Sequence, residues 1–316
     1  MLALKLAIVA LVVWFVHGTL VKAWHQIGEQ TWHLDFGWLA IAGGLYLLGL
    51  LPAGLFWLRV LRVMGQEAQL GETLRAYYIG HLGKYVPGKL MVVVIRAGLV
   101  RSHRVQTGVA AVSVFLETLT MMAVGACIAA GIIAARLREE TSLFWGAIGL
   151  MLVAGLPTVP PVFRRLAGLA GVGKSDPTAT ENLAKLGYGT LLFGWALMAI
   201  VWVMTGCSLW AVFRALEVED LALWEHLSGY TAAVSLAMVA GFLSLIPGGL
   251  GVRDLILLKL LVSLFAVSAA VATVASALLR LVWLVAELVI SGILYVGGLR
   301  RSRGKLTNDE ARMTNQ

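Results

Sequence analysis

The sequence SLIPGGLGVRDLILLKLL, residues 244–261, breaks a chain that is otherwise almost continuously apolar. Pro247 removes a backbone donor and clashes with a continuing helix, while glycine tolerates conformations that other residues avoid. The break holds Gly248, Gly249 and Gly251, and it is followed directly by Arg253, Asp254 and Lys259. In hydrocarbon, irregular backbone survives only inside protein or beside a wet cavity. The stretch therefore predicts a helix break facing a cavity; the alternative is a surface loop between two ordinary helices.

The composition of the chain is that of an integral membrane protein. Of its 316 residues, 59% are hydrophobic and 13% are charged. Crossing a hydrocarbon core of roughly 30 Å takes about 20 helical residues. Six apolar runs predict full spans, at residues 1–22, 38–58, 109–135, 143–160, 186–213 and 269–299. The first run has no small-residue cleavage site, so we expect a retained span rather than a signal peptide.

Charge asymmetry predicts how the chain crosses the membrane. Basic residues flank a second broken region, 70–100, fill the central loop and begin the segment 300–316, so these sites should be cytoplasmic. Acidic residues precede the broken region 227–265, which should be external. With both termini inside, the six spans alternate only if each broken region enters and leaves on one face. We therefore predict an all-α membrane fold with about six spanning helices and two re-entrant broken elements in inverted topology.

A weak internal repeat supports this topology. GKYVPGKLMVVVIRAGLV (83–100) and LSLIPGGLGVRDLILLKLL (243–261) share a Pro-Gly break, an apolar run and a basic residue. Each precedes a long helix with one deep ionisable residue, Glu117 in the first unit and Arg280 in the second. We therefore expect a single transmembrane domain over 1–299 with repeat units around 70–135 and 227–299, and a polar cytoplasmic tail over 300–316.

The breaks also predict an anion site. A new helix N-terminus presents free amides and the positive end of its dipole, and arginine adds a two-pronged hydrogen bond to phosphate. With helix breaks at Pro87, Gly88 and Pro247, the expected headgroup-binding residues are Lys84, Lys89, Arg96, Gly248, Gly249, Gly251 and Arg253. The alternative is that the lysines merely reach toward lipid headgroups at the membrane surface.

Charges inside the apolar helices predict a second polar feature. An isolated charge near the bilayer centre costs about 2.5–3.5 kcal/mol on insertion scales, so such groups should face the interior and find partners. We expect Arg280 to pair with Glu117 or Glu287, and Asp254 to complete a charge network that exchanges partners. The alternative is a static ion pair that only fixes helix packing. Tyr77, Tyr78 and Tyr85 are assigned to an interfacial aromatic belt.

Several function classes find no support in the sequence. There is no phosphate-binding P-loop, no Gly-x-Ser-x-Gly elbow and no zinc-protease motif, and neither Cys127 nor Cys207 has metal-ligand spacing around it. The formal charge of +8 comes from residues beside apolar runs, which argues against nucleic-acid binding. We expect no enzymatic activity, no catalytic residues, no metal and no cofactor.

Four stretches together resemble a known family: GKYVPGKLMVVVIRAGLV, SVFLE ending at Glu117, IPGGLGVRD, and LLRLVWLVAEL. They are similar to the lysylphosphatidylglycerol synthase transmembrane-region family over about residues 1–299. The resemblance implies a flippase-like module without the synthase domain. Asp254 departs from the pattern, since glutamate is more usual there, which shortens the reach of the acid.

The expected function is that of a lipid translocase in the plasma (inner) membrane of a prokaryote. It would bind an anionic phospholipid or a polyprenyl-phosphate-linked lipid in an intramembrane cavity and move it between leaflets. Two alternatives remain open: a membrane-embedded transferase acting on a lipid-linked substrate, and a non-transporting scaffold or accessory subunit. Besides lipids, a second copy of the chain or a separate lipid-modifying enzyme are candidate partners.

Overall fold

A computed structural model describes residues 33–86, 90–102, 105–136, 141–169, 177–218, 220–244, 249 and 251–313. Over these residues the chain forms helices joined by short turns, and the one β contact is an isolated bridge between Ser102 and Val105. Five helices are long and apolar enough to cross a membrane: α2 (Phe36–Val63), α5 (Thr107–Arg136), α10 (Tyr188–Ala215), α11 (Leu223–Leu243) and the first part of α13 (Ala269–Met313). The predicted all-α membrane fold is confirmed.

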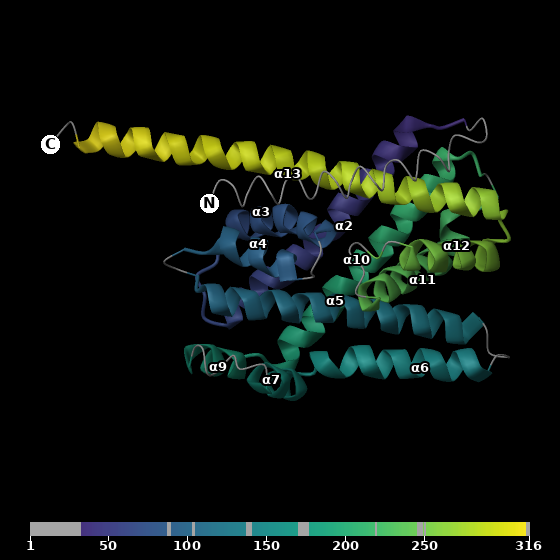
Figure 1. The fold of residues 1–316 in the computed structure, drawn as a ribbon, viewed down its shortest axis with the longest axis horizontal. Helices are drawn as coiled ribbons and strands as arrows, with labels where there is room; N and C mark the ends of the chain where they lie inside the picture. Colours follow the sequence, from purple (N-terminus) through teal and green to yellow (C-terminus); the bar gives the residue numbers. More distant parts are fainter. Residues whose placement is uncertain are drawn as a thin grey trace.

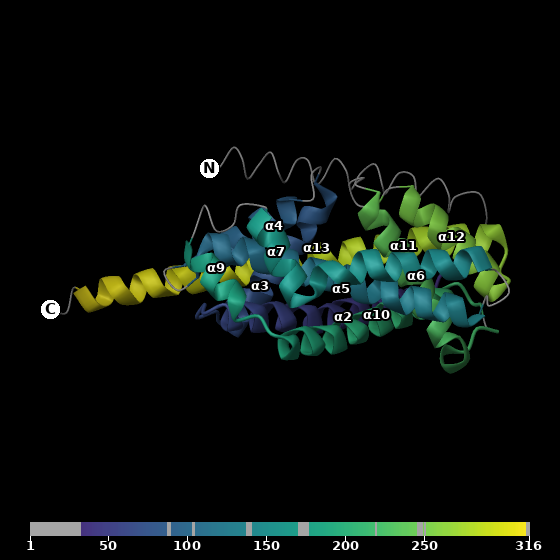
Figure 2. The same cartoon turned by 90° about the horizontal axis from the view of Figure 1, so that it is seen from below.

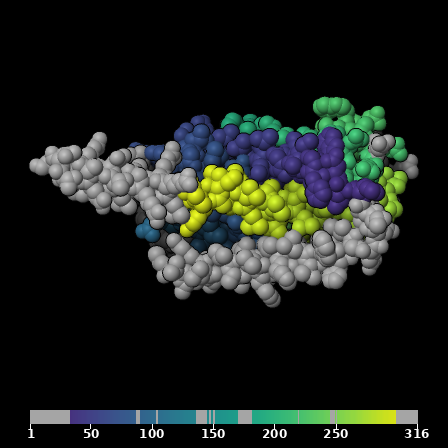
Figure 3. Space-filling model, turned by 90° about the horizontal axis from the view of Figure 1, so that it is seen from above, coloured from purple at the N-terminus to yellow at the C-terminus, as the bar shows by residue number. Residues whose placement is uncertain are grey.

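The long helices pack into one bundle. Helix α2 begins at Asp35, whose Oδ1 accepts hydrogen bonds from the amides of Gly37 and Trp38 at 2.7 and 3.2 Å. It packs most extensively on α10, and a Cβ at Gly49 would lie 2.8 Å from Cβ of Met204, so glycine allows the two helices to approach closely. Figure 3 shows α13, in yellow, lying along α2, in purple.

Four of the six predicted spans coincide with α2, α5, α10 and α13, and the run 1–22 lies outside the described residues. The predicted span 143–160 differs. It forms α6 (Thr141–Gly155), whose 15 residues rise about 22 Å, and then the 3-10 turn η2 (Leu156–Thr158). Pro157 and Pro160 prevent α6 from continuing as one helix. The short helices α7 (Pro160–Leu169) and α9 (Pro177–Ala184) follow.

The first broken region forms a helical hairpin. Helix α3 (Leu70–His81) runs into the 3-10 turn η1 (Leu82–Tyr85), and α4 (Leu90–Val100) returns beside it. With 12 and 11 residues, the two helices rise only about 18 and 17 Å. Gly80 lies against Arg96, and a Cβ at Gly83 would lie 2.7 Å from the Val92 nitrogen. Glycine at these two positions lets the hairpin close.

The second broken region differs in its proportions. Helix α11 has 21 residues and is itself a candidate span, whereas α12 (Val252–Phe265) has 14 and rises about 21 Å. Gly241 of α11 lies against Gly249 and Arg253, so α12 returns beside α11. Gly249 and Gly251 have φ angles of +65° and +82°, which L side chains rarely adopt, and this explains the glycines in the break.

The two hairpins lie toward opposite ends of the bundle, and both views agree on this (Figures 1 and 2). Their broken ends meet near the middle of the membrane-spanning part of α13, Ala269–Gly298. Lys84, just before the first break, contacts Glu287, and Arg253, just after the second break, lies over Trp283. Because Trp283 and Glu287 are four residues apart, they share one face of α13. This face of α13 carries the candidate site.

Candidate functional site

Arg96 of α4 and Glu117 of α5 form a closed ion pair. The Arg96 Nη1 lies 2.6 Å from the Glu117 Oε2, and the two side chains are 2% and 1% exposed. The Tyr77 hydroxyl donates to the Glu117 Oε1 at 3.1 Å, and the guanidinium lies over the Tyr77 ring, 3.9 Å from its centre. Glu117 of α5 therefore neutralises the buried arginine of the first hairpin. Arg96, which the sequence assigned to headgroup binding, instead belongs to this pair, and Tyr77 is part of the core rather than of a surface belt.

Lys84 and Glu287 form the second ion pair. The Lys84 Nζ lies 2.5 Å from the Glu287 Oε1, and the Tyr46 hydroxyl donates to the same oxygen. The Glu287 side chain is 1% exposed, while that of Lys84 is 21% exposed. The other carboxylate oxygen, Oε2, is buried and has no hydrogen-bond partner in the part of the chain that the structure describes. Of the two Glu287 oxygens, only Oε1 therefore accepts a hydrogen bond from the described residues.

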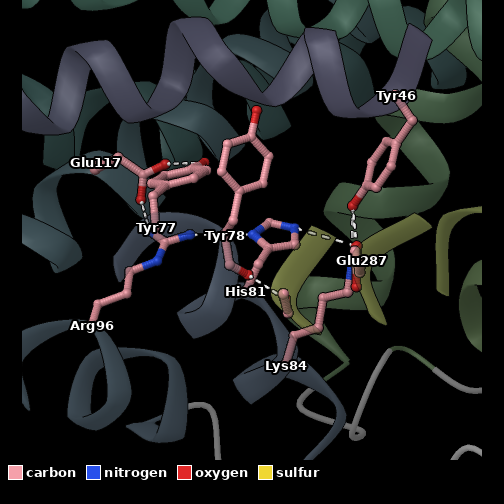
Figure 4. A network of polar contacts seen from close by, with 9 residues as sticks. Tyr46, Tyr77, Tyr78, His81, Lys84, Arg96, Glu117 and Glu287 are labelled. Atoms are coloured by element: carbon pink, nitrogen blue, oxygen red, sulfur yellow. Dashed lines mark hydrogen bonds and ion pairs between the residues drawn. The ribbon is translucent and has the colours of Figure 1, made fainter. Parts of the chain in front are cut away.

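His81 links the two ion pairs (Figure 4). The Arg96 Nη2 lies 3.2 Å from the His81 Nδ1, and the His81 Nε2 lies 3.8 Å from the Glu287 Oε1. Arginine can only donate, so the His81 Nδ1 must accept and the ring proton resides on Nε2, facing Glu287. Hydrogen bonds thus run from Glu117 through Arg96 to His81, and the His81 Nε2 lies near Glu287 without reaching hydrogen-bond distance. Sequence reasoning left His81 unassigned; its position on α3, six residues before Pro87, was the available signal.

Arg253 stands apart from these pairs. It is 7% exposed, and its guanidinium carbon lies 4.7 Å from the centre of the Trp283 ring. Trp283 is held by a 2.9 Å hydrogen bond from its Nε1 to the Ser208 Oγ and by stacking on Tyr46. Among the described residues, no carboxylate lies within ion-pairing distance of Arg253. Within the described part of the chain, this buried arginine is thus stacked on an indole and its donor edges contact no anionic side chain.

The sequence analysis expected Arg280 to pair with Glu117 or Glu287. In the structure Arg280 pairs with Asp254 instead. The Arg280 Nη1 lies 3.0 Å from the Asp254 Oδ2, and the Asp254 side chain is 37% exposed. The same oxygen accepts a 3.2 Å hydrogen bond from the Gly251 amide. Asp254 therefore caps the N-terminus of α12 and joins α12 to α13 through its ion pair with Arg280. An aspartate, which is shorter than a glutamate, is long enough here because α13 is the neighbouring helix.

These groups form what we call the central cluster: Lys84, Arg253, Asp254, Arg280 and Glu287. Arg253 and Arg280 are close enough for their charges to act on the Lys84 ammonium and on each other. Three cations face two carboxylates, which leaves the cluster with a net charge of +1. A charge imbalance of this kind in a buried setting favours an additional anion.

The glycines of the second break have unequal surroundings. Gly249 is buried, and a Cβ there would lie 2.9 Å from the Gly241 Cα, so glycine at this position lets the break pack closely on α11. Gly251 is exposed, and a Cβ there would meet nothing within 4 Å. The predicted site residues Pro87, Gly88, Lys89, Pro247 and Gly248 lie outside the described residues.

A separate cavity of about 110 Å³ lies at the far ends of α3 and α4 from the break. It is lined by Glu72, Arg75, Ala76, Leu99, Val100, Arg101 and Ser102. Arg75 is anchored there by a 3.2 Å hydrogen bond from its Nε to the Leu294 carbonyl. This cavity is distinct from the central cluster.

Comparison with known proteins agrees with the architecture. The family model for the lysylphosphatidylglycerol synthase transmembrane region matches residues 2–292. None of the curated proteins compared with the chain matches it. The family and the five candidate spans describe a multi-pass membrane protein connected to lipid metabolism or transport. On a match of nearly its whole length, the chain belongs to the lysylphosphatidylglycerol synthase transmembrane-region family.

Proposed function

We propose that the protein moves a lipid with an anionic headgroup between leaflets, and that Arg253 and Lys84 contact the headgroup. The observation that carries the proposal is the buried Arg253, which has no carboxylate partner among the residues that the structure describes. Charges at membrane depth are expensive and normally paired. A guanidinium stacked on an aromatic face still presents two parallel donors at its edge, which match a phosphate. A phosphate at Arg253 would neutralise the net charge of the central cluster.

The two hairpins supply a reason for this imbalance. On our proposal both are re-entrant, one from each face of a prokaryotic plasma membrane, with the termini in the cytoplasm and the breaks meeting near the midplane. The first unit places Glu117 on the helix after its buried arginine, and the two pair at 2.6 Å. In the second unit, the helix after the buried Arg253 carries Arg280, a cation, at the position comparable to Glu117. The lipid would supply the negative charge that Glu117 supplies at the comparable position of the first unit.

Partner exchange would link headgroup binding to movement. Lys84 is held by Glu287 and is one-fifth exposed, so it stands at the edge of the cluster. A phosphate arriving beside Lys84 competes with Glu287 for the ammonium, and His81 connects Glu287 to Arg96. Binding at the central cluster would thereby alter contacts within the first hairpin, which would give that hairpin a bound and an unbound arrangement. No chemical reaction is assigned to the chain.

The test is lipid transfer in proteoliposomes. Purified wild type and Arg253→Gln are reconstituted with phosphatidylglycerol that carries a fluorescent acyl chain and an unmodified headgroup. An external quencher removes the fluorescence of the outer leaflet, so the fraction of lipid that moves between leaflets can be followed. Losing a charge-assisted hydrogen bond worth about 1.5–3 kcal/mol should slow transfer by about tenfold or more. Arg214→Gln is the matched control, because Arg214 also lies over a tryptophan, Trp38, at 5.6 Å, but belongs to no ion pair of the cluster.

Each alternative function predicts a different result. A transferase would turn over a lipid-linked substrate in detergent, where there are no leaflets to cross. A scaffold would leave transfer at the level of protein-free liposomes for wild type and both variants. Equal transfer by wild type and Arg253→Gln, with both folded, would contradict the proposed site.

A further inference from the structure

We propose that the cavity at the ends of α3 and α4 far from their break binds a phosphate-class oxyanion, held by Arg75 and Arg101. The site is separate from the central cluster, and the inference does not depend on the proposed lipid transfer. It rests on three features: the size of the space beside the two arginines, the fixed position of Arg75, and the charges that line the cavity.

The cavity has the size of a small anion. Its volume is about 110 Å³, whereas a water occupies roughly 30 Å³ in the liquid and drug-sized ligands occupy pockets of roughly 300–1,000 Å³. It therefore has room for one phosphate group and not for a nucleotide. Arg75, which lines the cavity, contacts Gly298, the last residue of the candidate span in α13. The cavity thus lies at the edge of the apolar bundle, where water or a lipid headgroup can reach it.

Arg75 is held in place by α13. Its Nε donates a 3.2 Å hydrogen bond to the Leu294 carbonyl. A Cβ at Gly298 would collide with the Arg75 Cζ and Nη2, so the guanidinium lies directly against the glycine backbone. The side chain is half-buried, which argues against an arginine that merely extends into water. Among the described residues, no group accepts a hydrogen bond from Nη1 or Nη2, so these two donors are available to a ligand.

The charges that line the cavity favour an anion. Two arginines, Arg75 and Arg101, and one acid, Glu72, line it, so the lining has a net charge of +1. Within the part of the chain that the structure describes, none of the three forms an ion pair. Glu72 has a separate role, because it lies in the first turn of α3, where a carboxylate complements the helix dipole. The two arginines therefore lack an anion that a phosphate would supply.

An anion at Arg75 would strengthen the contact between α3 and α13. The same two helices are joined farther along by a 3.3 Å hydrogen bond from the Ser291 Oγ to the Tyr78 carbonyl. The central cluster lies at the other end of this contact, where Lys84 meets Glu287. Because Arg75 connects the cavity to α13, a bound anion should stabilise the folded protein against heat.

The first experiment measures thermal unfolding of the full-length protein in detergent with inorganic phosphate, against chloride at the same ionic strength. It uses the Arg253→Gln background, which lacks the proposed headgroup contact in the central cluster. We expect phosphate to raise the apparent melting temperature by about 2 °C or more. The phosphate concentration at half effect should rise about tenfold or more in Arg75→Gln. In Glu72→Gln, which removes the carboxylate from the lining, it should fall by about two- to fivefold.

Two adjacent glycines supply a matched pair of variants. Gly298→Ala displaces the Arg75 guanidinium without removing a charge, whereas a Cβ at Gly297 meets nothing within 4 Å. Both substitutions replace a helical glycine by alanine, so their intrinsic effects on the helix are equal. Gly298→Ala should weaken the response to phosphate, and Gly297→Ala should leave it unchanged.

A second measurement identifies the source of the phosphate group. The two glycine variants, in the same Arg253→Gln background, are incubated with phosphatidic acid, whose headgroup is a bare phosphate, and retained lipid is quantified by native mass spectrometry. Lower retention in Gly298→Ala than in Gly297→Ala assigns the site to a lipid headgroup. Equal retention, with a weaker response to inorganic phosphate in Gly298→Ala, assigns it to a soluble phosphate.

Equal lipid retention and an equal response to phosphate in the two glycine variants would overturn the inference. Because these measurements are made without Arg253, that result would leave the proposed headgroup site in the central cluster untouched. Conversely, a failure of Arg253→Gln to slow lipid transfer would contradict the proposed function and leave the site at Arg75 standing.

Discussion

Arg253 lies with its guanidinium carbon 4.7 Å from the centre of the Trp283 ring and, among the described residues, has no carboxylate partner. Arg96, the buried arginine of the other hairpin, lies 3.9 Å from the centre of the Tyr77 ring but is also paired with Glu117. Each hairpin therefore has an arginine stacked on an aromatic ring, and of the two only Arg96 has an anionic partner among the described residues. This asymmetry is the basis of the proposed lipid site.

The Arg96–Glu117 pair should dominate the stability of the first hairpin. Arg96→Leu leaves Glu117 buried without its cation, and breaking a buried pair costs about 3–5 kcal/mol. We expect the apparent melting temperature in detergent to fall sharply in Arg96→Leu and to recover largely in the double variant Arg96→Leu/Glu117→Leu. A double variant as unstable as the single one would show that the pair contributes beyond its own charges.

His81 should stabilise the fold because its Nδ1 accepts a hydrogen bond from Arg96. His81→Leu removes the acceptor for the Arg96 Nη2 and should destabilise the protein by about 1–3 kcal/mol, the cost of an unpaired buried donor. His81→Asn places an amide oxygen close to the position of Nδ1 and should recover much of that loss. Thermal unfolding of the two variants measures the difference; identical destabilisation would mean that the Arg96 contact contributes little.

Asp254→Asn should strengthen lipid retention. The substitution removes one of the two acids and raises the net charge of the central cluster from +1 to +2, while the remaining oxygen can still accept from Gly251. Because Asp254 is partly exposed, we expect a stability change below about 1 kcal/mol. Retained anionic lipid should rise, opposite in direction to Arg253→Gln. A fall in retention, in protein of unchanged stability, would argue against charge balance as the driving force.

Gly249 and Gly251 should respond differently to alanine. Both have positive φ, so each substitution incurs backbone strain of about 1 kcal/mol or more. At Gly249 a Cβ would also lie 2.9 Å from the Gly241 Cα, whereas at Gly251 it would meet nothing within 4 Å. Gly249→Ala should therefore lower the apparent melting temperature more than Gly251→Ala does. Equal effects would mean that α11 and α12 separate readily at this point.

The sequence predicted the features that depend on neighbouring residues alone, namely the membrane-spanning helices, the helix breaks and the buried Glu117. Runs of about 20 apolar residues identify α2, α5, α10 and α13, because the bilayer imposes that length. The Pro-Gly breaks correctly separated α3 from α4 and α11 from α12, and the depth of Glu117 in an apolar helix correctly indicated a buried, paired carboxylate. Re-entrance, inverted topology and the orientation of the termini stay predictions.

The pairings could not be predicted, because they depend on which helices are neighbours. Arg96 and Glu117 are 21 residues apart, and Lys84 and Glu287 are 203 apart, so no spacing rule connects either pair. Tyr46 sits in an ordinary apolar run, and only packing of α2 on α13 brings it to Glu287. Gly249 likewise has the flexibility that a phosphate loop needs, and only the fold shows that it also packs against Gly241. Tertiary contact decided the roles of these residues.

Native mass spectrometry of gently extracted protein tests the central claim most directly. Wild type, Arg253→Gln and Arg214→Gln are purified identically, and the lipids that remain bound are identified. We predict that wild type and Arg214→Gln retain one anionic lipid class, a phospholipid or a polyprenyl-phosphate lipid, and that Arg253→Gln loses it while staying folded. The same bulk lipids on all three proteins would contradict an internal headgroup site at Arg253.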